Sequence, residues 1–342
     1  MGDIMEQKNN YLINKEVGIE ERERIKYLDV LRGFLILTVV FGHIIDENDT
    51  LSIIIYTIHM PAFFIISGML NNINNKTKTL KYMGKRLKSL IIPYIIFSLM
   101  TIFIHIFINK GITGDIKSEI LSVIIGRGVG AVWFLMALFI AESIYLLLNR
   151  IINNKVINII IITLLFIFGI NGNNVYNSFY LFGIYRALIA LGFYSIGIYI
   201  SNYLRIIDIN NILIILILLI ILFLGIKNGR VDLWGLKFNN KILYVLNSLI
   251  GSIALIYLFK NIFNNIKFLS YLGKNTLIIM GTHQILIKII EVFTKYERYN
   301  MSISFVIFLI NILLEIPIIY LINNYLPWIL GRSSRKETLK LS

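Results

Sequence analysis

The stretch YLDVLRGFLILTVVFGHI, residues 27–44, decides the fold of this chain. It matches the roughly 20 mostly apolar residues that an α-helix needs to cross the hydrocarbon core of a bilayer. It also contains Asp29, Arg32 and His43, although ionisable groups are costly inside a membrane. The stretch therefore predicts a membrane-spanning helix whose polar residues have a function beyond anchoring.

The rest of the 342-residue chain repeats the apolar pattern, because 57% of its residues are hydrophobic and its mean hydropathy is +0.76. Apolar blocks predict ten spans at 28–46, 51–70, 88–109, 129–149, 154–171, 179–200, 211–226, 240–260, 275–292 and 303–325. Period-2 alternation is absent, which disfavours a barrel. We expect an all-α polytopic membrane bundle of about ten transmembrane helices. The fifth and seventh spans are nearly pure Ile and Leu and should face lipid, whereas the others should line the interior.

Charge predicts the orientation. Loops on the side of the N-terminus hold roughly twice as many Lys and Arg as the opposite loops, so both termini should be cytoplasmic. This divides the chain into a cytoplasmic segment 1–26, a membrane domain 27–330 and a cytoplasmic tail 331–342. The net charge of +14 then reflects topology and attraction to anionic lipid, and a nucleic-acid partner is not needed. Cysteine is absent, which excludes disulfides and a cysteine-bound acyl intermediate.

Arg32 and His43 lie on one face of the first helix. They are eleven residues apart, which places them about 20° apart around the axis and about 16 Å apart along it. A cation at the cytoplasmic interface and an imidazole deep in the membrane could form one functional line. Arg32 could equally be a positive-inside anchor and His43 a packed hydrogen-bonding residue.

The second span contains His59 shortly before Pro61. A proline inside a helix frees the carbonyl four residues earlier, and irregular membrane helix generally borders a cavity. We therefore expect His59 to face the same cavity as His43, with a purely structural role as the alternative.

The remaining candidates are scattered along the chain. The basic cluster over residues 76–88, which includes Lys85 and Arg86, suits either a phosphate-rich ligand or lipid headgroups.

Trp133 fits a substrate site or an interfacial aromatic belt. Glu142 and Arg186 could bind substrate, or could pair with each other and with Glu315 as structural charges. His283 lies on the same helix face as Thr276, seven residues before it. Three histidines on three spans, with no carboxylate at ligand spacing, disfavour a metal site.

Five motifs, taken in order, resemble the acyltransferase family 3 membrane O-acyltransferases. They are YLDVLRGFLILTVVFGHI, HMPAFFIISGML, GKRLKSLIIPY, VWFLMALF and YLGKNTLIIMGTHQILI, and together they cover nearly the whole chain. Within that family, the chain resembles the branch of fucose 4-O-acetylases, which lacks an appended soluble domain. Thr276 stands where the family commonly has Ser, and Met280 where it commonly has Tyr.

The resemblance implies transfer of an acyl group, commonly acetyl, from cytosolic acyl-CoA to a hydroxyl of a cell-surface or lipid-linked carbohydrate at the plasma membrane of a bacterium. Arg32 and His43 match the family's Arg-x10-His signature, and Lys85 with Arg86 match the basic pair associated with CoA. His59 and His283 match recurrent positions. With an ordinary pKa of about 6.5, a histidine such as His43 can accept the hydroxyl proton.

Two other classes remain open at this point. A polysaccharide exporter or flippase could use the same polar cavity without chemistry. A lipid-binding or structural protein would explain the basic cluster but would leave the alignment of Arg32 with His43 unexplained.

Overall fold

The computed structural model describes residues 25–71, 79–108, 114–172, 182–295 and 300–332, and most of these form helices. In chain order they are α2 (Lys26–Ile44), α3 (Thr50–Met69), α4 (Thr79–Arg86), the π turn η2 (Leu87–Ile91), α5 (Ile92–Ile108), α6 (Gly114–Ile124), η3 (Gly130–Val132), α7 (Trp133–Ile151), α8 (Lys155–Asn171), α9 (Phe182–Ile206), α10 (Asn211–Asn228), α11 (Lys241–Asn261), α12 (Lys267–Lys274), α13 (Thr276–Thr294), α14 (Met301–Tyr325) and η5 (Pro327–Leu330). The predicted all-α polytopic bundle is confirmed. Most of the two predicted cytoplasmic ends, and residues 76–78 of the basic cluster, lie outside the described residues.

Nine helical stretches in the described part of the chain are long and apolar enough to cross a membrane. The remaining predicted span, the fifth in chain order, is α8, which is helical but has only 17 residues. At 1.5 Å per residue it is about 26 Å long, slightly less than the hydrocarbon thickness. The ten apolar blocks of the sequence therefore all correspond to helices, and one of these is short.

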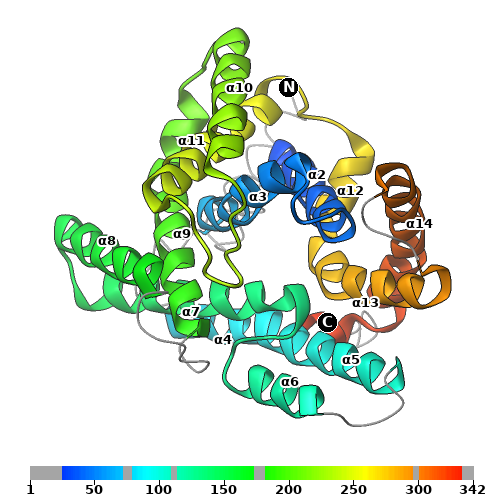
Figure 1. The fold of residues 1–342 in the computed structure, drawn as a ribbon. Helices are drawn as coiled ribbons and strands as arrows, with labels where there is room; N and C mark the ends of the chain where they lie inside the picture. Colours follow the sequence, from blue (N-terminus) through cyan, green and yellow to red (C-terminus); the bar gives the residue numbers. More distant parts are fainter. Residues whose placement is uncertain (1–24, 72–78, 109–113, 173–181, 296–299, 333–342) are drawn as a thin grey trace, which may run out of the picture.

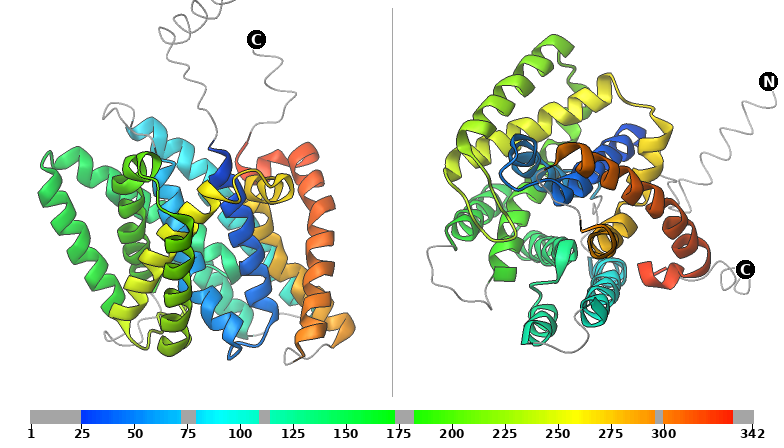
Figure 2. Two further views of the ribbon diagram at one scale, coloured as in Figure 1. Left: turned by 90° about the horizontal axis from the view of Figure 1, so that it is seen from above. Right: turned by 45° about the vertical axis from the view of Figure 1, so that its right-hand side comes forward.

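Helix α2 lies near the centre of the bundle, where it packs against α3, α11, α12, α13 and α14 (Figure 1). The beginning of α2 and the end of α14 reach the same face of the molecule (Figure 2). The helix that contains Arg32 and His43 is thus enclosed by other helices, and its polar side chains are kept away from lipid.

The lipid-facing helices differ in part from the prediction. Only 22% of the apolar window of α10 is buried, and α8 leaves Ile160, Leu164 and most of its other large side chains exposed, as predicted for the seventh and fifth spans. The prediction of an interior position was wrong for the stretch Tyr82–Ile108, which contains α5 and is only 33% buried, and it was wrong for α14, which is also only 33% buried. Its polar side chains Asn311 and Glu315 are fully buried on one strip, while its Ile and Leu side chains are largely exposed.

Local chemistry explains several helix features. Asn154, Asn210, Asn240 and Asn300 each accept a backbone N–H at the start of a helix, so part of the asparagine-rich composition serves as N-caps. Pro61 lies inside α3 and cannot donate to the Thr57 carbonyl. The Ser248 hydroxyl on α11 donates to that carbonyl at 2.7 Å instead, so the proline is tolerated within a continuous helix.

Two glycines bring α2 and α12 into backbone contact. A Cβ built on Gly33 would lie 1.9 Å from the carbonyl oxygen of Leu269, and one built on Gly273 would lie 1.7 Å from that of Asp29. Small residues permit such close approach between membrane helices. The contact fixes the position of α12, and therefore of the start of α13, relative to Arg32.

Candidate active site

His43 lies in the last turn of α2 and contacts side chains from two other helices. Its ring centroid is 5.3 Å from that of His283 on α13, and the Tyr56 hydroxyl on α3 is 3.4 Å from its Nδ1. The Nε2 of Gln284 is 3.1 Å from the His43 Nε2. His283 is fully buried, and its Nδ1 donates to the Ile279 carbonyl at 2.6 Å, so its other nitrogen presents a lone pair while the ring is neutral.

The amide of Gln284 is held in one orientation by the loop GRGVGA, residues 126–131. The Ala131 N–H donates to the Gln284 Oε1 at 3.0 Å. Gly130 has φ +63°, and a Cβ there would lie 2.4 Å from the same oxygen, so a glycine is required. With its oxygen held by the loop, Gln284 turns its NH₂ group toward His43. Its amide nitrogen lies 3.1 Å from the Nε2 and 3.3 Å from the Nδ1 of His43, so Gln284 restricts the position of the imidazole ring.

His43 opens onto a cavity of about 300 Å³, named here the His43 cavity. Its walls include Val39, Tyr56, His59, Met60, Gly130, Ala131, Trp133, Arg230, Asp232, Leu233, Trp234, Met280 and Gln284. The prediction that His59 faces the same cavity as His43 is therefore confirmed. Aromatic walls with a few polar groups are typical of small-molecule sites.

Arg186 lies behind the aromatic wall of the His43 cavity. Its guanidinium stacks over Trp133 at 5.3 Å and over Trp234 at 5.8 Å, and it donates to the Arg127 carbonyl at 2.9 Å. Arg127 stacks over Trp234 at 5.4 Å, and burial lowers the pKa of its guanidinium. These cation–π contacts join α9 to the two loops that precede α7 and α11. Arg186 thus supports the cavity wall, and a direct role for it in substrate binding stays a prediction.

Arg32 lies on a second cavity, of about 380 Å³, named here the Arg32 cavity. Its Nη2 donates to the Thr276 hydroxyl at 2.7 Å, and its Nη1 is 3.9 Å from the Asp29 carboxylate one turn earlier on α2. Other walls come from Tyr82, Arg86, Ser89, Glu142, Lys274, Gly331 and Arg332. Met280 lies on the walls of both this cavity and the His43 cavity.

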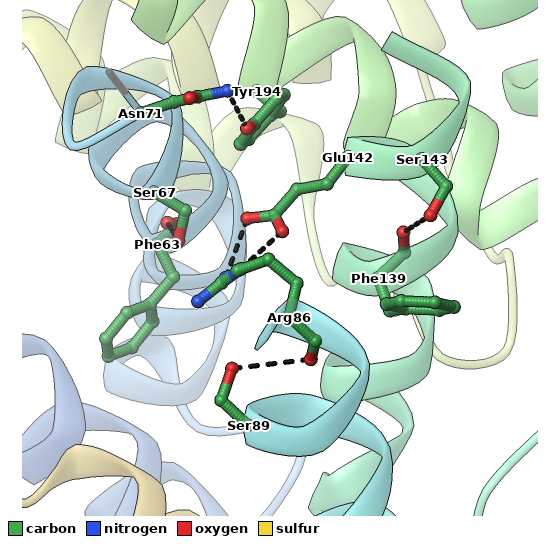
Figure 3. A network of polar contacts seen from close by, with 9 residues as sticks. All are labelled: Phe63, Ser67, Asn71, Arg86, Ser89, Phe139, Glu142, Ser143 and Tyr194. Carbon is green, nitrogen blue, oxygen red and sulfur yellow. Dashed lines mark hydrogen bonds and ion pairs between the residues drawn. The ribbon is translucent and has the colours of Figure 1, made fainter. Parts of the chain in front are cut away.

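Arg86 enters the Arg32 cavity from the turn where α4 meets the π turn η2. It forms a two-point ion pair with Glu142 on α7, with Nε to Oε2 at 2.6 Å and Nη2 to Oε1 at 2.7 Å (Figure 3). Two-point geometry fixes the plane of the guanidinium. Lys85 is exposed and is not among the residues lining that cavity, so the predicted basic pair is divided between the cavity and the surface.

The alternative in which Glu142, Arg186 and Glu315 pair with one another is wrong. Glu142 binds Arg86, Arg186 stacks on tryptophans, and Glu315 accepts from the Thr282 hydroxyl at 2.8 Å. Glu142, predicted on the substrate side, lies on the wall of the Arg32 cavity, and it does not line the His43 cavity. Trp133 and His59 do line the His43 cavity, and the roles of all these residues stay predictions.

Several residues at the site were not found from the sequence. Gln284 directly follows His283 and had no signal of its own. His105 on α5 pairs with Glu119 on α6 at 2.7 Å and lines a third cavity that also reaches His43. Asp232 and Trp234 belong to a loop, and the only available signal was a Trp between apolar residues in an otherwise polar segment.

The fold and these cavities define a polytopic membrane protein whose central helix, α2, contributes side chains to cavities near both of its ends. A family model described as an acyltransferase domain matches residues 25–331, and the chain belongs to this family of membrane acyltransferases, acyltransferase family 3. No curated protein and no solved structure matches the chain.

Proposed function

We propose that the chain is an O-acyltransferase of a bacterial plasma membrane that moves an acyl group, in the first instance acetyl, from cytosolic acyl-CoA to a carbohydrate hydroxyl. The acceptor is a cell-surface or lipid-linked glycan, as in the fucose 4-O-acetylase branch that the sequence resembles. One observation supports this most strongly. The Arg32 cavity and the His43 cavity lie at the two ends of α2 and share Met280 on their walls.

The Arg32 cavity suits the donor. The phosphates of CoA would bind Arg32 and Arg86, because guanidinium groups form charge-assisted hydrogen bonds to phosphate. Lys274 and Arg332 on the same wall add positive charge. The thioester would then extend past Met280 toward His43, a span set by the offset of about 16 Å along the helix.

The His43 cavity suits the reaction. His43 takes the proton of the acceptor hydroxyl while the oxygen attacks the thioester carbonyl carbon. The new C–O bond forms, the C–S bond breaks, and the CoA thiolate leaves and takes up a proton. The Tyr56 hydroxyl, 3.4 Å from the His43 ring, is a nearby donor for the developing oxyanion, and His59 on the same wall orients the acceptor.

The test uses the purified chain in lipid nanodiscs with radiolabelled acetyl-CoA and glycan from cells that lack the gene. We expect labelled, alkali-labile ester on the glycan, and we expect His43→Ala to lose it while inserting at equal abundance. Lys155→Ala, on the exposed surface at the start of α8, should leave the maximal rate unchanged. No ester with any glycan fraction, combined with loss of the surface glycan itself from deletion cells, would instead identify an exporter.

A further inference from the structure

The loop between α10 and α11 is built as a rigid part of the His43 cavity. The loop buries three of its own apolar side chains, those of Val231, Leu233 and Leu236. Its backbone is closed by two hydrogen bonds between Asp232 and Lys237, at 2.8 and 2.9 Å. At the ends of the loop, the Asn239 amide donates to the Asn228 carbonyl at 2.7 Å. Burial and hydrogen bonds hold the backbone of this loop, and therefore fix the positions from which its side chains extend.

Four residues of this loop line the cavity, and they differ in how they are engaged: Arg230, Asp232, Leu233 and Trp234. Arg230 stacks over Tyr56 at 4.4 Å, donates to the Glu47 carbonyl and the Ser52 hydroxyl, and lies 3.6 Å from the Glu47 carboxylate. The Asp232 carboxylate lines the cavity and interacts electrostatically with the Arg186 guanidinium, and within the part of the chain that the structure describes it makes no hydrogen bond or ion pair. Gly235 leaves space for it, since a Cβ there would lie 2.6 Å from its Oδ2.

We propose that Asp232 and Trp234, together with Trp133, form the acceptor-binding subsite of the His43 cavity. The proposal rests on the proposed transfer to carbohydrate. The apolar face of a sugar ring packs on Trp133 and Trp234, whose rings the stacked Arg186 holds in place. Ring hydroxyls donate to Asp232, which as a carboxylate only accepts.

Charged side chains of both signs surround this subsite. Arg230 lines the cavity beside Asp232, and its partner Glu47 is 3.6 Å away and 70% exposed, so a bound sugar meets a cation as well as a carboxylate. The cations Arg127 and Arg186 are engaged with the tryptophan rings behind the wall.

The first experiment identifies the acceptor residue. Glycan from deletion cells is acetylated by the purified chain in nanodiscs, digested, and analysed by mass spectrometry. Ester on one kind of sugar residue identifies the acceptor that the second experiment uses. Absence of ester on every residue would instead refute the proposed function.

The second experiment tests the residues with the same glycan. Asp232→Asn and Trp234→Ala should each raise the KM for glycan about tenfold or more, with the KM for acetyl-CoA unchanged. Asp208→Asn and Trp328→Ala are matched controls, because these side chains lie on exposed surfaces away from the cavity. Wild-type KM for glycan in both cavity variants, with ester still formed, would overturn the subsite while leaving the acyltransferase activity in place.

Discussion

Replacing Gly33 by Ala should disturb the donor site through the contact between α2 and α12. The new Cβ would lie 1.9 Å from the Leu269 carbonyl oxygen, whereas ordinary van der Waals contact begins near 3.4 Å, so α12 must withdraw by about 1.5 Å. Thr276, two residues after α12, accepts a 2.7 Å hydrogen bond from Arg32. A displacement of this size breaks that bond.

Two effects should follow from Gly33→Ala. Overpacking of this kind costs about 1–3 kcal/mol of stability. Loss of the Arg32 contact, with a misplacement of about 1 Å or more, should lower kcat/KM for acyl-CoA about 100-fold. Fluorescence-detected thermal unfolding in detergent measures the first effect, and initial rates with labelled acetyl-CoA measure the second.

Gly84 supplies the matched control, because a Cβ built there meets no atom within 4 Å. Gly84→Ala lies in helix α4 and should leave the rates unchanged while raising stability slightly, since Ala is favoured over Gly in helices by about 1 kcal/mol. If Gly33→Ala keeps both the wild-type unfolding midpoint and the wild-type kcat/KM, the close contact between α2 and α12 does not position Arg32.

Two further predictions concern residues that line the Arg32 cavity and the His43 cavity. Glu142→Gln removes the partner of Arg86, whose side chain is 28% exposed, so unfolding should become easier by about 2 kcal/mol, less than the 3–5 kcal/mol typical of a fully buried pair. The double variant Arg86→Met with Glu142→Leu should recover most of that stability yet bind acyl-CoA more weakly, and an unchanged KM for acyl-CoA would contradict the donor role. Gln284→Leu removes the group that faces His43 and should lower kcat about 10- to 100-fold with little change in the KM for acyl-CoA. The reverse pattern, a raised KM at wild-type kcat, would refute a positioning role for Gln284.

The membrane fold could be predicted from the sequence because lipid imposes a nearly fixed length on each apolar block. The same constraint does not say which side of a helix faces lipid. On α14 a strip with Asn311 and Glu315 suggested an interior helix, although most of the helix surface is exposed. Hydropathy averages over a helix, whereas burial depends on which strip meets a neighbour.

The site was predicted where its residues share one helix and was missed where they do not. Helical geometry alone placed Arg32 and His43 on one face, and Pro61 marked the second wall of the cavity. The partner of Glu142 could not be read from the sequence, because Arg86 is 56 residues away and meets it only through the packing of α4 against α7. Gln284 and Asp232 gain their positions from glycine turns and a short backbone bridge, which leave weak traces in composition.

Met280 lies on the wall common to the Arg32 cavity and the His43 cavity. A protein that receives one reactant from each side of a membrane risks becoming a leak for ions and protons between turnovers. Methionine is unbranched and has three rotatable bonds, so it can close a narrow passage and vacate it without any backbone movement. We therefore expect the side chain of Met280 to separate the two cavities between turnovers, at a position where an aromatic ring would swing less freely.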